Sequence, residues 1–491
     1  MKYRTITQML SLSLVVTLVG CGGSSNSADT SQPLPPVATS QTTVGQITGF
    51  GSIYVNGVEY DTTGSVYDVD DSVASGDDAL AVGMVVKVQG SVNADGQTGH
   101  ADNIFYDDDI EGIVENLATD ANDPNIKTFM VMGVSVQADK NGTNFEGEDD
   151  PTFGFDTIID GDNVEVSGEF SGEFSGDILI ASYIEKQDAS DDDFEVKGTV
   201  DQYNSSDQFV LILRNESRLN ITIAAGAEIP STGVMDGQYV EVEGTIPDPV
   251  NAPDSMLAMK VELEDHDRIG DDDDDEVEIK GTLNYNPDLE TWSVMDVQLS
   301  FDGDPEYSPQ DLAVSIADLS ADGLYVEVDG KYVNGVLLVD EIELEEDDLE
   351  FKADVDSISA TDARDGTMTL TFGAANGTVD IRVTPDTMFL DDEAMNHYDL
   401  NSIMTGDKVE IDARMGADGI IYASSLHLED DLGYEIEGPV DAIDAVSITV
   451  VGVTFVVDMN TFFENGTPVE GDYAEVEDDG DGVADSVEID D

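Results

Sequence analysis

The stretch Gly237-Gln238-Tyr239-Val240-Glu241-Val242 decides the fold of this chain, because close variants of it occur at six places in the 491 residues. In each place a glycine precedes a short segment in which apolar residues alternate with charged or polar ones. This is the pattern of a strand with one buried face. Repetition along a chain indicates a tandem array of similar structural units. The other copies begin at Gly83, Gly161, Gly323, Gly406 and Gly471.

Further strand segments surround each copy of this motif. An opening strand such as 279–283 precedes it, and residues 53–60 form a predicted hairpin around Asn56-Gly57, the strongest short hairpin signal. A closing strand such as 181–185 completes the unit. Five short strands in this order predict an all-β chain of about six small five-stranded barrels, of the oligonucleotide/oligosaccharide-binding (OB) type. Small β-sandwiches are the alternative.

Runs of acidic residues fall between the copies and mark the predicted domain boundaries. Examples are 107–109 and 271–275. Because like charges repel, we expect these joints to be solvated and somewhat extended. The predicted β-domains are 45–106, 110–187, 194–265, 277–346, 350–430 and 434–491, after a signal peptide at 1–20 and a flexible Gly/Ser/Pro-rich tether at 21–44.

The N-terminus has the features of an exported lipoprotein. Lys2 and Arg4 form a short positive segment, residues 9–19 are apolar, and Cys21 follows them. The apolar run is too short to span a bilayer as a helix. The arrangement resembles the lipobox of bacterial lipoproteins, which implies lipidation of Cys21 and anchoring by several acyl chains. The Gly22 that follows, where Asp would imply the inner membrane, implies the outer membrane, on its periplasmic face or at the cell surface.

The start of the first copy carries a second resemblance. Residues 49–58 read Gly-Phe-Gly-Ser-Ile-Tyr-Val-Asn-Gly-Val, and Gly-x-x-Val-x-Val-x-Gly strands recur downstream. With the lipobox and the tether, these motifs are similar to bacterial proteins of the family of the domain of unknown function 5666. The resemblance covers most of 45–491. It implies export and tandem β-domains, and it implies no catalytic residues.

The charge balance narrows the range of partners. The chain has 108 acidic and 18 basic residues, for a formal net charge of -90. A polyanion repels nucleic acid, whose binding depends on Lys and Arg, whereas it attracts cations. We expect its stability to rise with salt, because ions screen the self-repulsion. The predicted partners are the membrane, through the lipid anchor, together with cations and an envelope protein or polysaccharide.

The C-terminal segment resembles a calcium loop. Counted from Glu477, acidic residues occupy positions one, three, five, nine and twelve, with glycine at position six, as in the loop of helix–loop–helix calcium proteins. The segment departs from that loop by its first residue, Glu instead of Asp, and by flanks that alternate like strands. An acidic hairpin turn is the alternative. The candidate Ca²⁺ ligands are Glu477, Asp479, Asp481, Val483, Asp485 and Glu488.

The sequence contains no arrangement that predicts catalysis. Its four histidines are far apart, and it has no nucleophile elbow, phosphate loop or haem motif. We therefore expect a non-enzymatic envelope protein of structural, adhesive or ligand-binding type, with no cofactor other than Ca²⁺. The alternative is a carboxylate-dependent enzyme or accessory module that acts on extracellular polysaccharide, for which Trp292 and an insert at 301–310 mark the place to look.

Lipidation of Cys21 can be tested in cells. We expect the full chain, expressed in a Gram-negative host, to incorporate an alkyne-bearing fatty acid and to fractionate with the outer membrane. Cys21→Ser should abolish both, because a serine hydroxyl cannot form the thioether that carries the lipid, whereas Ser25→Ala should change neither. Labelling of the Cys21→Ser chain at the level of the unchanged protein would contradict the assignment.

Overall fold

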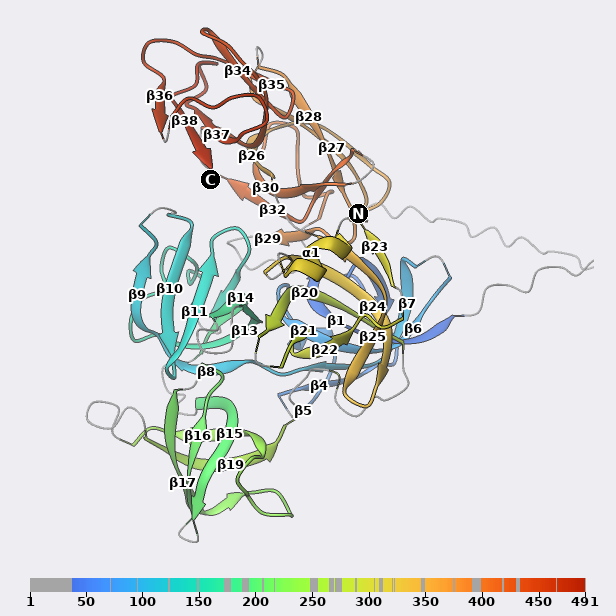
Figure 1. Ribbon diagram of the computed structural model, residues 1–491, viewed down its shortest axis with the longest axis vertical. Coiled ribbons are helices and arrows are strands. Elements are labelled where there is room, and N and C mark those ends of the chain that lie inside the picture. The colour runs from blue at the N-terminus through green and yellow to red at the C-terminus, as the bar shows by residue number, and fades with distance from the viewer. Residues whose placement is uncertain are drawn as a thin grey trace, which may run out of the picture. The chain divides into compact units, whose positions relative to one another are not determined.

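The computed structural model describes residues 38–490 with gaps, and these residues are mostly strands (Figure 1). The predicted signal peptide, Cys21 and the tether up to residue 37 lie outside the described residues. Within the described ranges the helical elements are α1 (Leu312–Asp318) and the 3-10 turn η1 (Asp77–Ala79), and neither is long and apolar enough to cross a membrane. The gaps are 71, 95, 122–123, 148–149, 172–177, 188–193, 205–206, 216, 248–254, 265–268, 270–275, 288, 304, 309–311, 320, 322, 346–348, 374–375, 391–398, 417–418, 430–432 and 465.

The first repeat closes into a five-stranded barrel. Its opening strand β1 (Thr39–Gly49) pairs with β2 (Ile53–Val55), which forms a hairpin with β3 (Val58–Asp61). Strand β3 lies parallel to the closing strand β7 (Thr98–Tyr106), and β6 (Val85–Val92) pairs with both β7 and β1. The ring order one-two-three-five-four is that of the OB-type barrel.

Five more units repeat this strand order, so the prediction of tandem OB-like barrels is confirmed and the sandwich alternative is wrong. In unit 6 a single bridge between Val456 and Val483 stands in for the last strand pairing of the ring. Unit 1 is the barrel of β1 to β7. Unit 2 contains β8 (Ile110–Ile113), β9 (Glu115–Thr119), β10 (Ile126–Val131), β11 (Val134–Asp139), β13 (Asn163–Ser171) and β14 (Ile178–Lys186). Unit 3 contains β15 (Phe194–Asn204), β16 (Gln208–Ile212), β17 (Arg218–Glu228), β18 (Tyr239–Thr245) and β19 (Ser255–Leu263).

Units 4 to 6 complete the array, and each has a short strand parallel to its closing strand, as units 1 and 2 also have. Those short strands are β4 (Val66–Val69), with β5 (Ser72–Ala74) beside it, β12 (Asn144–Gly147), β23 (Glu306–Ser308), β29 (Met388–Leu390) and β36 (Phe462–Glu464). Unit 4 contains β20 (Glu276–Asn286), β21 (Thr291–Val294), β22 (Val297–Ser300), β24 (Tyr325–Val333) and β25 (Val336–Leu344). Unit 5 contains β26 (Leu349–Ala360), β27 (Gly366–Thr371), β28 (Thr378–Val383), β30 (Lys408–Met415), β31 (Ile421–Ala423) and β32 (Ser425–Glu429). Unit 6 contains β33 (Tyr434–Ile443), β34 (Ser447–Val450), β35 (Val453–Val456), β37 (Tyr473–Asp478) and β38 (Ser486–Asp490).

The first barrel begins earlier than the sequence analysis predicted. Residues 39–44 belong to the predicted tether, whereas the structure places them in β1. Thr42, Thr43 and Val44 are buried because this half of β1 has a strand on each side. Threonine is as typical of strands as of linkers, so composition alone could not separate the two.

A glycine in the fourth strand of units 1 to 4 bends the barrel wall. In unit 2 the strand pairing between β13 and β14 shifts register at Gly168, and a Cβ added there would lie 2.0 Å from the carbonyl oxygen of Ile180. Such a β-bulge increases the local twist and helps a small sheet to close. The equivalent residues in units 5 and 6, seven positions after the turn glycine, are Ala413 and Asp478.

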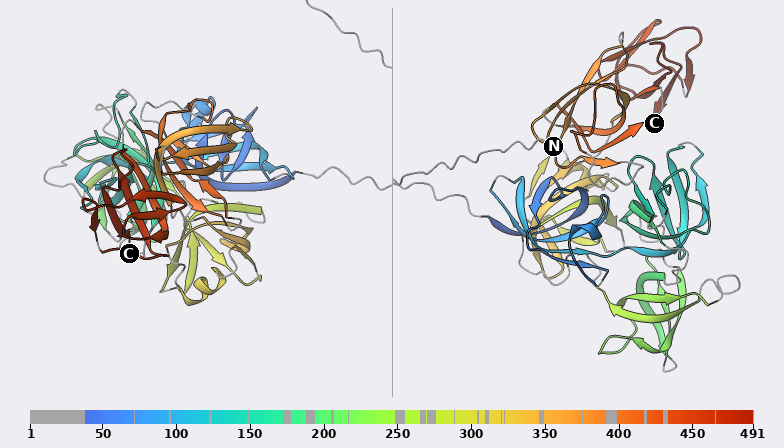
Figure 2. Two further views of the ribbon diagram at one scale, coloured as in Figure 1. Left: turned by 90° about the horizontal axis from the view of Figure 1, so that it is seen from above. Right: turned by 180° about the vertical axis from the view of Figure 1, so that it is seen from behind.

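The barrels are joined in pairs through their opening strands. Strand β8 pairs antiparallel with β15, and β26 pairs antiparallel with β33, so that units 2 and 3, and units 5 and 6, each form one continuous sheet. Strand β1 pairs in parallel with β20, and this joins unit 1 to unit 4, which are not neighbours in sequence (Figures 1 and 2). We call each of these strand junctions a seam. The cores follow the same division, since one apolar cluster extends through units 2 and 3 and another through units 5 and 6.

The seam between units 1 and 4 predicts a specific cross-link. Gln41 and Glu276 are directly opposite each other in the parallel pair, so cysteines at these positions should form a disulfide under mild oxidation. The fragment 22–491 contains no other cysteine. We expect faster migration of the Gln41→Cys/Glu276→Cys chain on a non-reducing gel and no shift for either single variant. Failure of the double variant to cross-link while it remains folded would refute the pairing.

Candidate functional site

Two rows of carboxylates cross the seams. In a sheet, residues directly opposite one another project from the same face, with Cα atoms about 4.5–5.5 Å apart. We call the rows ladder 1 and ladder 2, and each crosses five barrel strands with an acidic residue on every one. Ladder 1 is Glu185, Glu165, Glu111, Glu195 and Glu243. Ladder 2 is Glu488, Glu475, Glu437, Glu350 and Asp412. Beyond these five, the short strands β12 and β36 add one more acid in register, Glu146 opposite Glu185 and Glu464 opposite Glu488.

The alternation of the repeat explains why the ladders lie outside the barrels. In unit 2 the buried Ile110 and Val164 face the core, so Glu111 and Glu165 face outward. The same holds for the other ladder residues, all of which are partly buried at the seams. Like charges directly opposite each other destabilise a sheet. The ladders therefore need protons or cations to compensate them.

A lysine on the opening strand supplies part of this compensation in three units. Lys197, Lys280 and Lys352 each lie directly opposite a glutamate of the fourth strand, namely Glu241, Glu327 and Glu410. In units 2 and 6 the corresponding pairs are both acidic, and these pairs form part of the two ladders. Each ladder thus has one lysine in the adjacent row of its own seam.

The cluster around Lys197 contains more acid than base. The ammonium donates hydrogen bonds to Asp107 and to the backbone carbonyl of Asp108, and it lies 3.7 Å from Glu195 and 3.6 Å from Glu241. Burial alone would lower the pKa of Lys197, but the surrounding carboxylates, Asp107 first, raise it well above the usual range. Lys197 is therefore a permanent positive charge among four carboxyl groups.

The carboxyl groups of this cluster hold protons more tightly than exposed ones. Burial, and then the charge of Glu195, raises the pKa of Glu241 to about 9. Burial raises the pKa of Glu195 to about 7, even though Lys197 opposes the shift, and burial raises that of Asp108 well above its ordinary value. Within ladder 1, burial and the charge of Asp70 raise the pKa of Glu165 to about 8.

Ladder 2 also holds a buried glutamate with a raised pKa, and the cluster around Lys280 also gathers carboxylates about one ammonium. Burial, followed by the charge of Glu435, raises the pKa of Glu350 to about 10. Lys280 lies 2.7 Å from Glu345, which also forms an ion pair of 2.9 Å with Arg414 of unit 5. Charged side chains therefore connect units as well as fill the seams.

Two acidic joints contradict the expectation of solvated linkers. Asp108, in the joint between units 1 and 2, is 4% exposed, and Glu345, the first residue of the acidic run 345–348 that follows unit 4, is 6% exposed. A lysine of an opening strand lies beside each of them: Lys197 donates to the backbone carbonyl of Asp108, and Lys280 lies 2.7 Å from the Glu345 carboxylate. The runs 191–193 and 271–275 lie outside the described residues.

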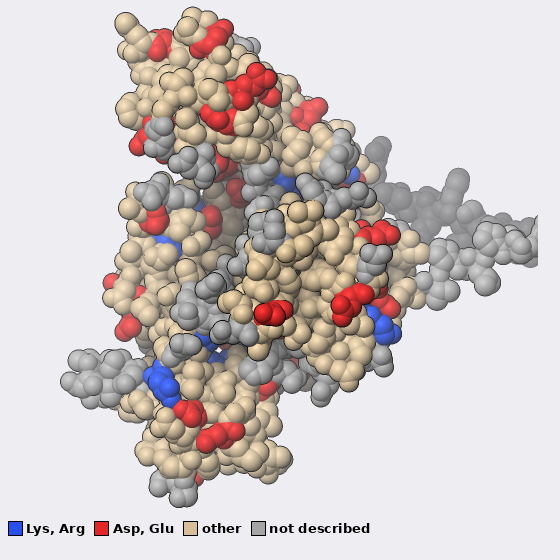
Figure 3. All heavy atoms as spheres, viewed as in Figure 1, with Lys and Arg blue, Asp and Glu red and all other residues tan. Residues whose placement is uncertain are grey.

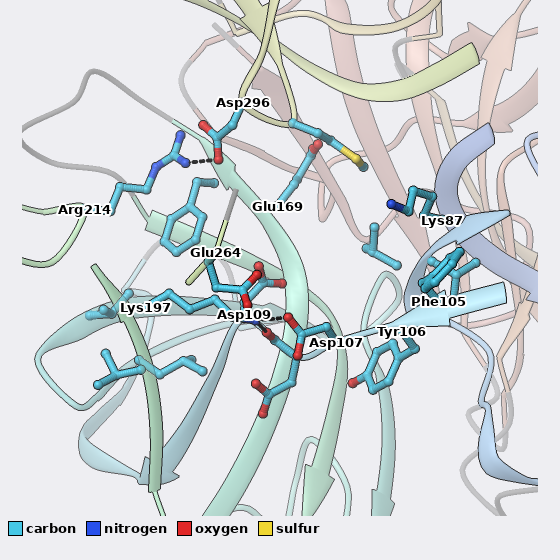
Figure 4. A pocket seen from close by; sticks show the side chains of 18 of the residues that line it. Lys87, Phe105, Tyr106, Asp107, Asp109, Glu169, Lys197, Arg214, Glu264 and Asp296 are labelled. Atoms are coloured by element: carbon cyan, nitrogen blue, oxygen red, sulfur yellow. Dashed lines mark hydrogen bonds and ion pairs between the residues drawn. The ribbon is translucent and has the colours of Figure 1, made fainter. Parts of the chain in front are cut away.

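A cavity of about 260 Å³ adjoins the Lys197 cluster (Figure 4). Residues of units 1 to 4 line it, and the joint residues Asp107 and Asp109 point into it together with Glu264. On its far side Arg214 of unit 3 forms an ion pair with Asp296 of unit 4. On the molecular face in Figure 3, basic side chains lie isolated among acidic ones, so that face presents no basic patch.

The predicted calcium loop forms a tight hairpin turn between β37 and β38. The backbone amide of Asp479 donates to Asp485 Oδ2 at 2.8 Å, and these two carboxylates form a group with Asp478 that is compact enough to hold an ion. The other predicted ligands are not in this group: Glu477, Asp481, Val483 and Glu488. Glu477 accepts a hydrogen bond from Ser486, Asp481 accepts one from the amide of Val483, and Glu488 belongs to ladder 2.

Asp478 is the residue of this turn that sequence reasoning missed. Its carboxylate is buried and accepts hydrogen bonds from the amides of Gly480, Asp481 and Gly482. These three amides provide hydrogen-bond donors to the Asp478 carboxylate, so it can be buried in the turn without a bound ion. The signal was present in the repeat, since Asp478 occupies the position of the bulge glycine of units 1 to 4.

The histidines and Trp292, the other residues that the sequence singled out, lie in surroundings that a structural role explains. His427 is buried and lies 3.3 Å from Glu429, whereas His100 is partly exposed beside Asp102. Trp292 is 7% exposed, and its ring packs 4.9 Å from that of Tyr285 in the core of unit 4. The other two histidines, His266 and His397, lie outside the described residues.

Comparison with known proteins gives one family. A family model described as a domain of unknown function (DUF5666) matches residues 43–101, 111–185, 280–343, 355–427 and 437–488, which are units 1, 2, 4, 5 and 6. No curated protein matches the chain. Among solved structures, a Drosophila protein titled Unr CSD456 is 12% identical over 48% of this chain and 96% of its own length. Its TM-score of 0.11 is too low to carry a structural argument.

The Lys197 cluster predicts an unusual dependence of stability on pH. The pKa values of Glu195 and Glu241, about 7 and 9, lie above the ordinary glutamate value of 4.5, so the folded state holds protons that the unfolded chain releases. This contribution is fully present below about pH 4.5 and is lost as the pH rises through about 7 to 9. In a buffer without divalent cations, the melting temperature should therefore fall between pH 5 and pH 9.

Lys197→Met should destabilise the protein by about 3 kcal/mol or more near pH 8, because it leaves buried carboxylates without their cation. The loss should be smaller at pH 5, where protons replace the ammonium. Arg218→Met, which removes an exposed ion pair with Asp201, should cost less than about 1 kcal/mol at either pH. Chemical unfolding at the two pH values measures both, and an effect of Lys197→Met that does not vary with pH would contradict the assignment.

Proposed function

The chain belongs to the DUF5666 family, and we propose that it is a non-enzymatic scaffold of the bacterial cell envelope that is stiffened by divalent cations. One observation carries the proposal: each of two seams holds five acidic positions in register across the fused sheets. Catalysis needs one or two acids in distinct environments, whereas a row of equivalent acids at strand spacing suits repeated, bridging contacts with cations.

The chemistry of the ladders supports calcium as the bridging ion. Hard divalent cations take carboxylate oxygens, and Ca²⁺ accepts six to eight of them in irregular arrangements that include water. Glutamates on adjacent strands can share such an ion across a seam. Cation binding there would strengthen the junction between two barrels without the need for a new contact between their cores.

The proposed location follows from the N-terminus. A chain anchored in the outer membrane through Cys21 would carry its barrels at the end of a Gly/Ser/Pro-rich tether, in contact with the ions and polymers of the periplasm or the cell exterior. We propose an envelope protein or an extracellular polysaccharide as its partner. The alternative of a polysaccharide-directed enzyme or accessory module drew on Trp292, and the burial of that ring leaves it with little surface for a sugar.

Calcium should stabilise the protein through ladder 2. We expect millimolar CaCl₂ to raise the melting temperature of the purified protein more than NaCl of equal ionic strength does, because specific binding adds stability beyond screening. The double variant Glu437→Gln/Glu475→Gln should lose a large part of this additional rise. Glu115→Gln/Glu228→Gln, at exposed positions outside both ladders, is the matched control and should retain it.

Two results would overturn the scaffold proposal. The first is equal stabilisation by CaCl₂ and by NaCl at the same ionic strength, which would mean that the acids attract only a diffuse ion atmosphere. The second is turnover of a polysaccharide by the purified protein that a single carboxylate substitution abolishes.

A further inference from the structure

Four of the six barrels surround a second cavity, which has a volume of about 470 Å³. Residues of units 1, 2, 4 and 5 line it. We propose that this cavity binds a neutral saccharide of one or two sugar rings. The inference rests on the proposed function only in taking a polysaccharide as the partner, and it adds the class of sugar and the place where the sugar binds.

Hydrogen bonds between units define the walls of this cavity. The hydroxyl of Thr48 in unit 1 donates a hydrogen bond of 2.9 Å to the backbone carbonyl of Pro385 in unit 5. The hydroxyl of Ser182 in unit 2 donates one of 2.6 Å to the carbonyl of Gly83 in unit 1. Because Thr48 and Ser182 line the cavity, its own lining residues connect unit 1 to units 2 and 5.

Two further contacts close the ring of four units. Glu169 of unit 2 accepts hydrogen bonds from the amide and the hydroxyl of Thr282 in unit 4, at 2.9 and 2.6 Å. Lys280 of unit 4 donates a hydrogen bond of 2.5 Å to Asp386 of unit 5. The cavity is therefore preformed, as small-molecule sites usually are, and its volume falls within the range of about 300–1,000 Å³ for such sites.

The lining mixes hydrogen-bonding groups with small apolar surfaces. Its neutral polar residues are Gln46, Thr48, Asn56, Ser182, Thr282, Tyr325, Ser424 and Ser425. Each hydroxyl of a sugar both donates and accepts hydrogen bonds, so a sugar needs both kinds of partner around it. The carbon–hydrogen faces of its ring pack against apolar side chains, here Ile180, Ala181 and Met388. This combination suits a saccharide better than a purely apolar ligand.

Two groups of the lining are available to a ligand. Within the part of the chain that the structure describes, the side-chain amide of Gln46 has no hydrogen-bond partner. Asp386 bonds Lys280 through Oδ2, and among the same residues its Oδ1 accepts no hydrogen bond. Both side chains are half-buried, so solvent reaches them. An amide that donates and accepts, together with a free carboxylate oxygen, can bind adjacent hydroxyls of one ring from units 1 and 5.

The charges of the lining favour a neutral sugar over an acidic one. Five carboxylates and one ammonium line the cavity, namely Asp139, Glu169, Glu345, Asp386, Asp412 and Lys280. A phosphate or a uronic acid would be repelled by this negative field. Protein groups already bind the carboxylates, since Glu345 pairs with Lys280 and Arg414. Asp412 likewise accepts a hydrogen bond of 2.6 Å from Ser425, so a cationic ligand is not needed to balance the lining.

Titration calorimetry on the intact purified protein in high-salt buffer tests the site. The neutral probes are cellobiose, maltose and N,N′-diacetylchitobiose, and digalacturonic acid and spermidine are the charged controls. We expect saturable binding of at least one neutral disaccharide and none of the charged controls. Gln46→Ala should weaken that binding by about three- to tenfold, because it removes one set of hydrogen bonds.

A second pair of variants separates occupancy of the cavity from a general effect. Gln46→Tyr should abolish saccharide binding, because the larger ring occupies the space of the sugar. Gln208→Tyr, the same change at an exposed position of β16 in unit 3, is the matched control and should bind as the unchanged protein does. Circular dichroism and the melting temperature show that each variant is folded, and Gln46→Ala keeps the test valid if Gln46→Tyr does not fold.

Three results would overturn the site. They are the absence of saturable binding by all three neutral disaccharides, unchanged affinity in folded Gln46→Ala, and binding of spermidine as tight as that of the saccharides. The scaffold proposal is judged separately by its calcium experiment. Calcium-specific stabilisation without saccharide binding would leave the scaffold and remove this site, whereas saccharide binding without calcium-specific stabilisation would do the reverse.

Discussion

The opening strand of each barrel takes part in two sheets, and the rest of the architecture depends on this double pairing. One edge of the strand closes its own five-stranded ring through the fourth strand, and its first residues also pair with the opening strand of a second barrel. A small barrel has a marginal core when it is alone. The seam converts two marginal barrels into one sheet with a shared apolar cluster, as in units 2 and 3.

The same pairing creates the electrostatic problem of this molecule. Glutamates that would be exposed on an isolated barrel become neighbours across the seam and lose part of their contact with water. Raised pKa values of residues such as Glu165 and Glu350 are the direct result. One lysine in the row beside each ladder offsets part of the charge, Lys260 pairs with Glu243 at the end of ladder 1, and the remainder must be met by protons or cations. The strand pairing that stabilises two barrels therefore also gathers the acids that can bind cations.

The copies differ at two positions that affect charge and strand geometry, the opening-strand lysine and the bulge glycine. The opening-strand lysine of units 3, 4 and 5 is replaced by Glu111 in unit 2 and by Glu437 in unit 6, and these are the members that complete the ladders. The bulge glycine of the first four units becomes Asp478 in unit 6, where its carboxylate holds a turn together. Units 2 and 6 therefore contribute an acid to a ladder at the position where units 3, 4 and 5 contribute a lysine.

The sequence by itself determined the strands, their order and the closure of each barrel, because these follow from local alternation, from turn glycines and from the hairpin at Asn56-Gly57. It also indicated that acids would dominate the chemistry. Only the tertiary structure decided which barrels join, since the pairing of β1 with β20 brings together segments more than two hundred residues apart and leaves no local signal. The ladders, the burial of Asp108 and the convergence of Asp107 with Glu195 and Glu241 all depend on that choice. Alternation shows which face a glutamate occupies, but its neighbours on that face are set by strand pairing between units.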